Sequence, residues 1–205
     1  MKIAVYGGSG MVGSQIVNEA VNRGHEVTSL SRSGELADSA LADKVLAQQA
    51  EISDLGTVQQ LATRNDVIVV AIAPPRDGGD HTPLVEAHEQ LAETLLPARL
   101  FVIGGAGALQ AGDGQLKDQP GFPDEYKPEA ETMSKILDAY RDSSGVDWTM
   151  LAPAPVIAPG ERTGSYTLGA ESPVGDSIST QDFAIAVLDE IENPQHRERR
   201  FTVAN

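Results

Sequence analysis

Three glycines spaced three residues apart stand near the start of the chain, in the stretch VYGGSGMVGSQ. Gly7 would permit a tight turn, Gly10 would let a pyrophosphate approach the backbone, and Gly13 would let a helix pack against a strand. A loop of this kind at a helix start offers amide N–H groups and a positive dipole end, and both attract phosphate. We therefore expect dinucleotide binding by Gly7, Ser9, Gly10, Met11, Val12 and Gly13, with the amides of Gly10, Met11 and Val12 aimed at the phosphates. The alternative is an ordinary glycine turn without a ligand.

A second candidate is the arginine in the stretch SLSRSG, at the end of the second predicted strand. Units that bind NAD usually carry Asp or Glu there for the ribose hydroxyl, whereas Arg32 is the only charge here. An arginine can donate two parallel hydrogen bonds to a 2′-phosphate and can stack on adenine. The sequence predicts NADP(H) in preference to NAD(H), the alternative being a solvated surface arginine. Near the expected adenine, Ile52 could pack on the ring and Glu51 could accept a hydrogen bond from its amino group.

Apolar segments of strand type alternate with amphipathic segments of helix type along the chain. Strands are predicted at residues 2–6, 25–32, 44–48, 66–73, 99–105, 146–153 and 199–205, and helices at 11–22, 54–63, 83–96, 129–143 and 181–192. This alternation predicts an α/β fold, a Rossmann-like doubly wound parallel sheet, as a single domain over residues 1–205. The ligand crevice of such a sheet lies at the carboxyl ends of its strands.

The loops at those carboxyl ends supply the remaining candidates. For the cofactor we expect Ala71, Ala73 and Pro74 after the fourth strand, Gly104 after the fifth, and Pro153, Ala154, Pro155 and Val156 after the sixth. For the substrate we expect Arg76, Gly105 and Ala106, with Arg76 meeting an acidic substrate or a cofactor phosphate. Residues 152–180, rich in Pro and Gly, are predicted to be a small C-terminal lid or substrate region rather than sheet, with GERTGSYTLG folding over the site as a hairpin.

Composition excludes several classes of function. The 205 residues carry a formal charge of −15, which disfavours nucleic acid and anionic membranes as partners. The absence of cysteine excludes disulfides, thiolate metal sites and a cysteine nucleophile. Without an apolar run of about 18 residues, we expect a soluble cytoplasmic monomer or homodimer that acts on a small-molecule acceptor. We expect His81 and His88 to be surface residues rather than metal ligands, and HRERR (residues 196–200) to be a solvated strand edge.

Longer stretches resemble a known family, notably FVIGGAGAL (residues 101–109) and APGERTGSY (residues 158–166). The whole chain resembles the atypical short-chain dehydrogenase/reductase group of NmrA-like NAD(P)H-binding proteins, often labelled NADH-flavin reductases. This resemblance implies an NADPH-dependent oxidoreductase of low specificity that passes hydride to a flavin, a quinone or a similar acceptor. FMN or FAD would then be a substrate rather than a prosthetic group. The Gly-Asp motif that relatives carry after the third strand is Ala50-Glu51 here.

The catalytic motif of typical short-chain dehydrogenases is incomplete. These enzymes use Tyr-x-x-x-Lys with a serine on the preceding strand, and the lysine lowers the pKa of the tyrosine so that it can pass a proton. Here the fifth strand ends in GGAGA, and Ala130 stands four residues after Tyr126. Tyr126 is the candidate catalytic acid or, alternatively, a loop residue covering the pocket. A flavin or quinone accepts hydride directly and can take its proton from water, so placement against the nicotinamide could suffice.

Two other functions stay open. A non-catalytic NAD(P)-binding redox sensor of the NmrA type would not need the missing serine and lysine. An epimerase or dehydratase acting on a nucleotide sugar would need the tyrosine–lysine pair and a larger C-terminal domain, and the sequence shows neither.

Overall fold

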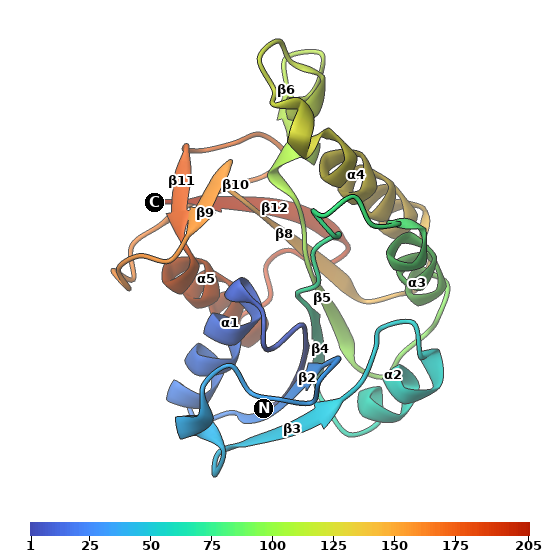
Figure 1. Cartoon of the computed structure of the whole chain (residues 1–205), viewed down its shortest axis with the longest axis vertical. Coiled ribbons are helices and arrows are strands. Elements are labelled where there is room, and N and C mark those ends of the chain that lie inside the picture. The colour runs from blue at the N-terminus through green and yellow to red at the C-terminus, as the bar shows by residue number, and fades with distance from the viewer.

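One eight-stranded sheet runs through the computed structural model, which describes all 205 residues (Figure 1). The strand order is β10-β12-β8-β5-β4-β1-β2-β3, and every neighbouring pair is parallel except β10 with β12. The predicted Rossmann-like doubly wound sheet is therefore confirmed, with its order reversing between β1 and β4. The strands are β1 (Lys2–Tyr6), β2 (Glu26–Ser31), β3 (Val45–Gln49), β4 (Val67–Val70), β5 (Arg99–Ile103), β8 (Trp148–Pro153), β10 (Thr167–Gly169) and β12 (Arg199–Ala204).

Five helices cover the two faces of this sheet. The blue α1 (Met11–Asn22) and the red-brown α5 (Thr180–Glu192) lie on one face, and α2 (Leu55–Ala62), α3 (Thr82–Ala92) and α4 (Lys127–Asp142) lie on the other (Figure 1). Side chains alternate along β1, so Ile3 and Val5 enter the core under α1 and α5 while Ala4 and Tyr6 enter the opposite core. This burial on both faces explains why the strands read as continuous apolar runs.

The helix starts differ in a way that bears on function. Asp54 caps α2 by accepting a hydrogen bond from the Thr57 amide at 3.1 Å, and Ser179 caps α5 by accepting one from the Asp182 amide at 3.0 Å. The α1 helix begins on Gly10 with no side-chain cap and no acidic residue in its first turn. Its first amides therefore lack both a helical acceptor and a side-chain acceptor, and remain free for a ligand.

Residues 152–180 do not form the expected hairpin over the site. In this region β9 (Val156–Ala158) pairs in parallel with β11 (Ser177–Ser179), and β10 joins the edge of the main sheet. The intervening residues 160–166 are tied to the helices of the α1 and α5 face. Arg162 donates to both carboxylate oxygens of Glu19 at 2.9 and 2.8 Å, and the amides of Thr163 and Gly164 donate to Asp182 at 2.8 Å each. The hairpin prediction was wrong because these charged contacts fasten the segment against α1 and α5.

The surface predictions were wrong for His88 and for one residue of HRERR, Arg200, whereas Arg197, Glu198 and Arg199 are exposed. His88 is 1% exposed, because it lies on the inner side of α3, where its Nδ1 is 3.0 Å from the Tyr140 hydroxyl. Arg200 is buried because β12 runs between β8 and β10 rather than at an edge. Its guanidinium donates to the carbonyl of Ala108 and to the carboxylate of Glu171.

The remaining elements are short. A two-residue hairpin of β6 (Gln110–Ala111) and β7 (Gly114–Gln115) stands out from the body above α4 (Figure 1). Short 3-10 turns occupy residues 39–41, 106–108, 116–118 and 124–126. No helix combines the length and the apolar character that a membrane crossing requires.

Candidate dinucleotide site

The glycine loop is held in place by its own backbone. Gly7 has a positive φ of 77°, and a Cβ at this position would lie 2.3 Å from the carbonyl oxygen of Ala71. The amides of Gly7 and Gly8 both donate to the carbonyl of Leu30, at 2.9 and 3.1 Å, which joins the loop to the end of β2. The Gly10 amide donates to the Gly7 carbonyl at 2.9 Å. The expectation that the Gly10 amide points at a phosphate is therefore wrong, because the turn itself uses that group.

The glycines of the loop have different roles. A Cβ on Gly13 would lie 2.1 Å from the Gly7 carbonyl oxygen, so this glycine permits close packing of α1 on the loop, as predicted. A Cβ on Gly8 would lie 2.3 Å from Ser29 Oγ, a close approach that the sequence pattern does not reveal because the motif leaves this position unspecified. A Cβ on Gly10 would meet only the Gly7 carbonyl oxygen, at 3.2 Å. Gly10 thus leaves an open cradle at the start of α1.

This cradle fits a pyrophosphate. The Ser14 amide is the first in α1 to find a backbone acceptor, the Gly10 carbonyl at 2.9 Å. The amides of Met11, Val12 and Gly13 precede it and have no acceptor within the helix. They lie at the positive end of the α1 dipole, where an anion is stabilised. Ser9 and Met11 are exposed beside the cradle, and Val12 is half-buried.

Arg32 differs from the other cations of the chain in its place and in its lack of an ion pair. Ten of the fifteen Lys and Arg residues form ion pairs within the chain. The five without one are Arg32, Lys44, Arg64, Lys135 and Arg199. Of these only Arg32 directly follows the carboxyl end of a strand, β2, and it is exposed there. Its neighbours Ser31 and Ser33 hold the turn, accepting hydrogen bonds from the amides of Gly34 and Glu35 at 3.0 and 3.2 Å.

The two residues expected at the adenine differ in burial. Glu51 is exposed at the start of the segment between β3 and α2 and could accept a hydrogen bond. Ile52 is only 7% exposed and packs in the core cluster with Tyr6 and Leu30. Ile52 therefore supports the loop and offers the adenine ring little surface. Its expected role of packing on adenine is corrected accordingly.

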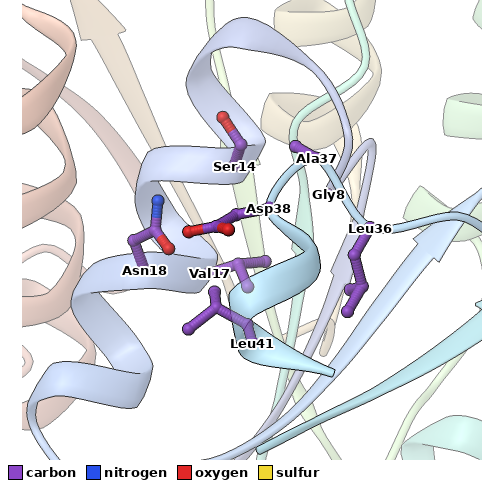
Figure 2. A pocket seen from close by; sticks show the side chains of 8 residues that line it. All are labelled: Gly8, Ser14, Val17, Asn18, Leu36, Ala37, Asp38 and Leu41. Carbon is purple, nitrogen blue, oxygen red and sulfur yellow. The ribbon is translucent and has the colours of Figure 1, made fainter. Parts of the chain in front are cut away.

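A hollow beside α1 is separate from the cradle. Figure 2 shows it between the flank of α1 and the segment after β2, lined by Gly8, Ser14, Val17, Asn18, Leu36, Ala37, Asp38 and Leu41. The side chains of Asn18 and Asp38 turn toward one another across it, whereas the Ser14 hydroxyl points away from both (Figure 2) and donates to the Met11 carbonyl at 3.4 Å. The Asp38 carboxylate makes this hollow unsuitable for a phosphate, so we place the pyrophosphate at the end of α1 and not on its flank.

The residues expected around the nicotinamide fall into two groups. Pro155 and Val156 are exposed after β8, and Ala73 is exposed after β4, so these side chains can line a pocket. Pro153 and Ala154 are buried, and Ala154 belongs to the core under α1 and α5. Pro74 is buried as well, and Ala71 and Gly104 are half-buried. We expected the side chains of Pro153, Ala154 and Pro74 to contact the cofactor. Because they are buried, this expectation is corrected, and their role is to support the backbone of the site.

The glycines after β5 are explained by packing. A Cβ on Gly104 would lie 3.0 Å from the Met150 side chain, and one on Gly105 would lie 2.9 Å from the Met133 side chain. A Cβ on Gly107, which sequence reasoning missed, would lie 2.4 Å from Ala130 Cβ. The segment GGAGA therefore lets the end of β5 approach α4 closely. Gly105 was expected to contact the substrate, and this role is corrected to packing against α4. Its neighbour Ala106 is half-buried and is still open to a substrate.

Arg76 and Tyr126 bring together the segments that follow β4 and β5. The Arg76 guanidinium donates two hydrogen bonds to Glu129, at 2.7 and 3.0 Å, and its central carbon lies 5.9 Å from the centre of the Tyr126 ring. The charge of Arg76 is thus already neutralised, which argues against the expected acidic substrate or cofactor phosphate. Tyr126 has no hydrogen bond to a lysine, and the adjacent Lys127 pairs with Asp124 at 2.6 Å. The arrangement that lowers the pKa of tyrosine in typical dehydrogenases is absent.

An uncapped helix start, an open glycine cradle and an order reversal in a parallel sheet are typical of a dinucleotide-binding protein. A profile of the NAD(P)H-binding family matches residues 7–194. The Bacillus subtilis (strain 168) protein YwnB, itself uncharacterised, is 39% identical over 217 residues, which cover 100% of this chain and 99% of YwnB.

Two solved structures are similar over their whole length. A candidate exported protein of Burkholderia pseudomallei is 34% identical with a TM-score of 0.86, covering 100% of each chain. A candidate NADH-flavin reductase of Streptococcus pneumoniae TIGR4 is 32% identical with a TM-score of 0.84, covering 100% of this chain and 99% of that one. The chain belongs to the NAD(P)H-binding family, in the NmrA-like group of atypical short-chain dehydrogenases/reductases.

Proposed function

We propose that this protein is an NADPH-dependent reductase that passes hydride to a flavin, a quinone or a similar planar acceptor. The observation that carries the proposal is the open cradle at Gly10 combined with Arg32, the one unpaired cation that follows the carboxyl end of a strand. The cradle accounts for the pyrophosphate, and Arg32 accounts for the 2′-phosphate that distinguishes NADPH from NADH. The Streptococcus pneumoniae structure, named as a flavin reductase candidate, supports the choice of acceptor.

The reaction needs little from the protein beyond placement. Reduced nicotinamide supplies a hydride, which is two electrons and one proton, and a flavin or quinone takes this hydride while water supplies the second proton. The start of α1 would hold the pyrophosphate, and the exposed Pro155 and Val156 would bound the nicotinamide pocket. Reduction of a simple carbonyl would require a proton donor for the alkoxide, and neither a serine after β5 nor a lysine four residues after Tyr126 is present.

The rest of the proposal concerns where the reaction occurs. We place the protein in the cytoplasm as a monomer or homodimer, with a small-molecule acceptor as its partner. The net charge of −15 supports the choice of a small-molecule partner, because it disfavours nucleic acid and anionic membranes.

The experiment is NADPH oxidation by the purified protein, followed at the nicotinamide absorbance, against riboflavin, FMN, FAD and a set of quinones. Turnover with NADPH that exceeds turnover with NADH on any of these acceptors is the expected result. Tight NADPH binding with no oxidation by any acceptor would contradict the proposal and favour a redox sensor. The missing serine and lysine are the observation that favours this second function.

A further inference from the structure

The strand β10 covers only the second half of β12. It pairs with residues Thr202–Ala204, whereas β12 begins at Arg199. Beside the uncovered half, on the face that carries α5, a cavity of about 210 Å³ opens between β10, β12, α5 and the turn that follows this helix. None of its lining residues belongs to the glycine loop or to the segments after β4 and β5, so the cavity is separate from the dinucleotide site.

Rings and apolar side chains form most of the wall of this cavity. Phe201 is buried, and the imidazole of His196 stacks on it with ring centres 4.1 Å apart and planes 4° apart. Ala186 of α5 and the half-buried Tyr166 add further apolar surface, and Leu168 is 46% exposed at the mouth. Because an apolar cavity of about 150 Å³ can hold benzene, this one has room for one aromatic ring with a substituent.

Glu190 fixes the tautomer of His196. The Glu190 side chain is 4% exposed, and its carboxylate accepts hydrogen bonds from the Arg99 guanidinium at 2.7 Å and from His196 Nδ1 at 2.8 Å. A carboxylate paired with a guanidinium is ionised and can only accept, so Nδ1 must carry the shared proton. The other nitrogen of the neutral imidazole, Nε2, is then an acceptor. Nε2 has no partner within the chain and is not enclosed by it.

The other inner polar groups of the cavity are acceptors as well. The Tyr166 hydroxyl donates to the Asp189 carboxylate, which also accepts a hydrogen bond from Arg23 at 2.8 Å. The proton of Tyr166 is thus already used, and only lone pairs remain on its oxygen. The ion pairs of Asp189 with Arg23 and of Glu190 with Arg99 offset both carboxylate charges. The cavity therefore calls for a ligand that donates a hydrogen bond, and it does not require a cation.

We propose that this cavity binds a neutral aromatic ring that carries an O–H or N–H donor, as phenol and indole do. The ring packs against Tyr166 and Phe201, and its donor bonds to Nε2 of His196. This is a second binding site, remote from the glycine loop, and it does not depend on the proposed reductase function. The absence of NADPH oxidation would leave it unaffected.

NMR titration of the ¹⁵N-labelled protein with phenol and with anisole tests the donor. Anisole has the same ring, but a methyl ether replaces the O–H group. Phenol should shift the amide signals of α5 and β12 with a dissociation constant at least about fivefold lower than that of anisole, because only phenol can satisfy Nε2. Indole and 1-methylindole provide a second pair with the same expected order. The amide signals of residues 7–13 should not move with any of these ligands.

His196→Phe tests the acceptor. It keeps a flat ring on Phe201 and removes Nε2, so phenol and anisole should bind with affinities within about twofold of each other. Glu190 keeps Arg99 and the backbone amides of residues 195 and 196 as donors, and circular dichroism checks that the variant is folded. His25→Phe is the matched control, because His25 is also half-buried and bonded to a glutamate, at 2.8 Å, but does not line the cavity. It should keep the wild-type preference for phenol.

Ala186→Leu tests the cavity itself, because the longer side chain enters it from α5 and should weaken both ligands about tenfold or more. Leu168→Trp fills the cavity from its exposed mouth and serves the same purpose if the change in α5 prevents folding. Three results would overturn the proposal: no shifts at α5 and β12 with any ligand, equal affinities of the wild type for phenol and anisole, or a preference for phenol that persists in folded His196→Phe. Undiminished binding by a folded filled variant would overturn it too.

Discussion

In the glycine loop, the groups available to a ligand belong to the backbone. In the segments after β4 and β5, which we call the acceptor side, the candidate groups are side chains that already have partners within the chain. The amides of Met11 and Val12 begin an uncapped helix, and Gly10 keeps the cradle beside them open. After β4 and β5, by contrast, Arg76 is paired with Glu129, and the glycines make room for Met133 and Met150. The difference shows that local backbone geometry shapes the glycine loop. Contacts between distant segments shape the acceptor side.

The largest expected effect comes from filling the cradle. Gly10→Val should abolish NADPH binding, with affinity reduced more than about a hundredfold, because its side chain would occupy the space of the pyrophosphate. The protein should stay folded, since a Cβ there meets only one backbone oxygen, at 3.2 Å. Calorimetry measures the binding, and circular dichroism checks the fold. Gly56→Ala, where a Cβ lies 3.4 Å from the nearest atom, is the control. Retained binding by a folded Gly10→Val variant would mean that the loop is only a turn.

The free energy of unfolding should depend on pH through His88 of α3, on the acceptor side, and not through the glycine loop. Burial lowers the pKa of His88 from 6.5 to about 4, so the unfolded chain binds a proton that the folded one excludes. The stability that depends on neutral His88 is full above pH 6.5 and is lost as pH falls toward 4, about 3 kcal/mol in all. Urea unfolding at pH 7, 5.5 and 4.5 should show a clearly smaller loss for His88→Gln than for wild type. Equal losses would argue against a buried neutral His88.

Arg32 tests whether a single side chain sets the cofactor preference. Charge-assisted hydrogen bonds to the 2′-phosphate should contribute about 1.5–3 kcal/mol, which is roughly ten- to a hundredfold in affinity. Arg32→Ala should lose most of the preference for NADPH and leave NADH binding nearly unchanged. Arg64→Ala, another unpaired exposed arginine, provides the control. Equal calorimetric affinities of the wild type for NADPH and NADH would refute this role of Arg32.

The smallest effect is expected at the Tyr126 hydroxyl. If hydride passes directly to a flavin or quinone, water supplies the proton, and general acid catalysis worth about 10²–10⁴-fold is not needed. Turnover of Tyr126→Phe should therefore stay within about tenfold of wild type on the acceptor identified. Steady-state kinetics with saturating NADPH measures it. A hundredfold decrease with cofactor binding intact would return Tyr126 to the role of catalytic acid.

How far the sequence predicts the structure differs between these two regions. The helix at residues 11–22 has the same bounds in the structure, and β1 does as well, because both follow from local apolar periodicity and a glycine signal. The predicted fourth strand extends to residue 73, but β4 ends at Val70, where pairing with β5 stops. The hairpin over the site was mispredicted since nothing local marks Arg162 as the partner of Glu19.

The sequence by itself determined the alternation of strands and helices and the glycine loop before α1, because each depends on residues close together along the chain. Only the tertiary structure decided that Arg76 is neutralised by Glu129, that Gly105 makes room for Met133, and that His88 is buried against Tyr140. Partners of this kind are separated by 28 to 53 residues. Their pairing depends on how α3 and α4 pack on the sheet, and the residue pattern of either helix alone does not contain that information.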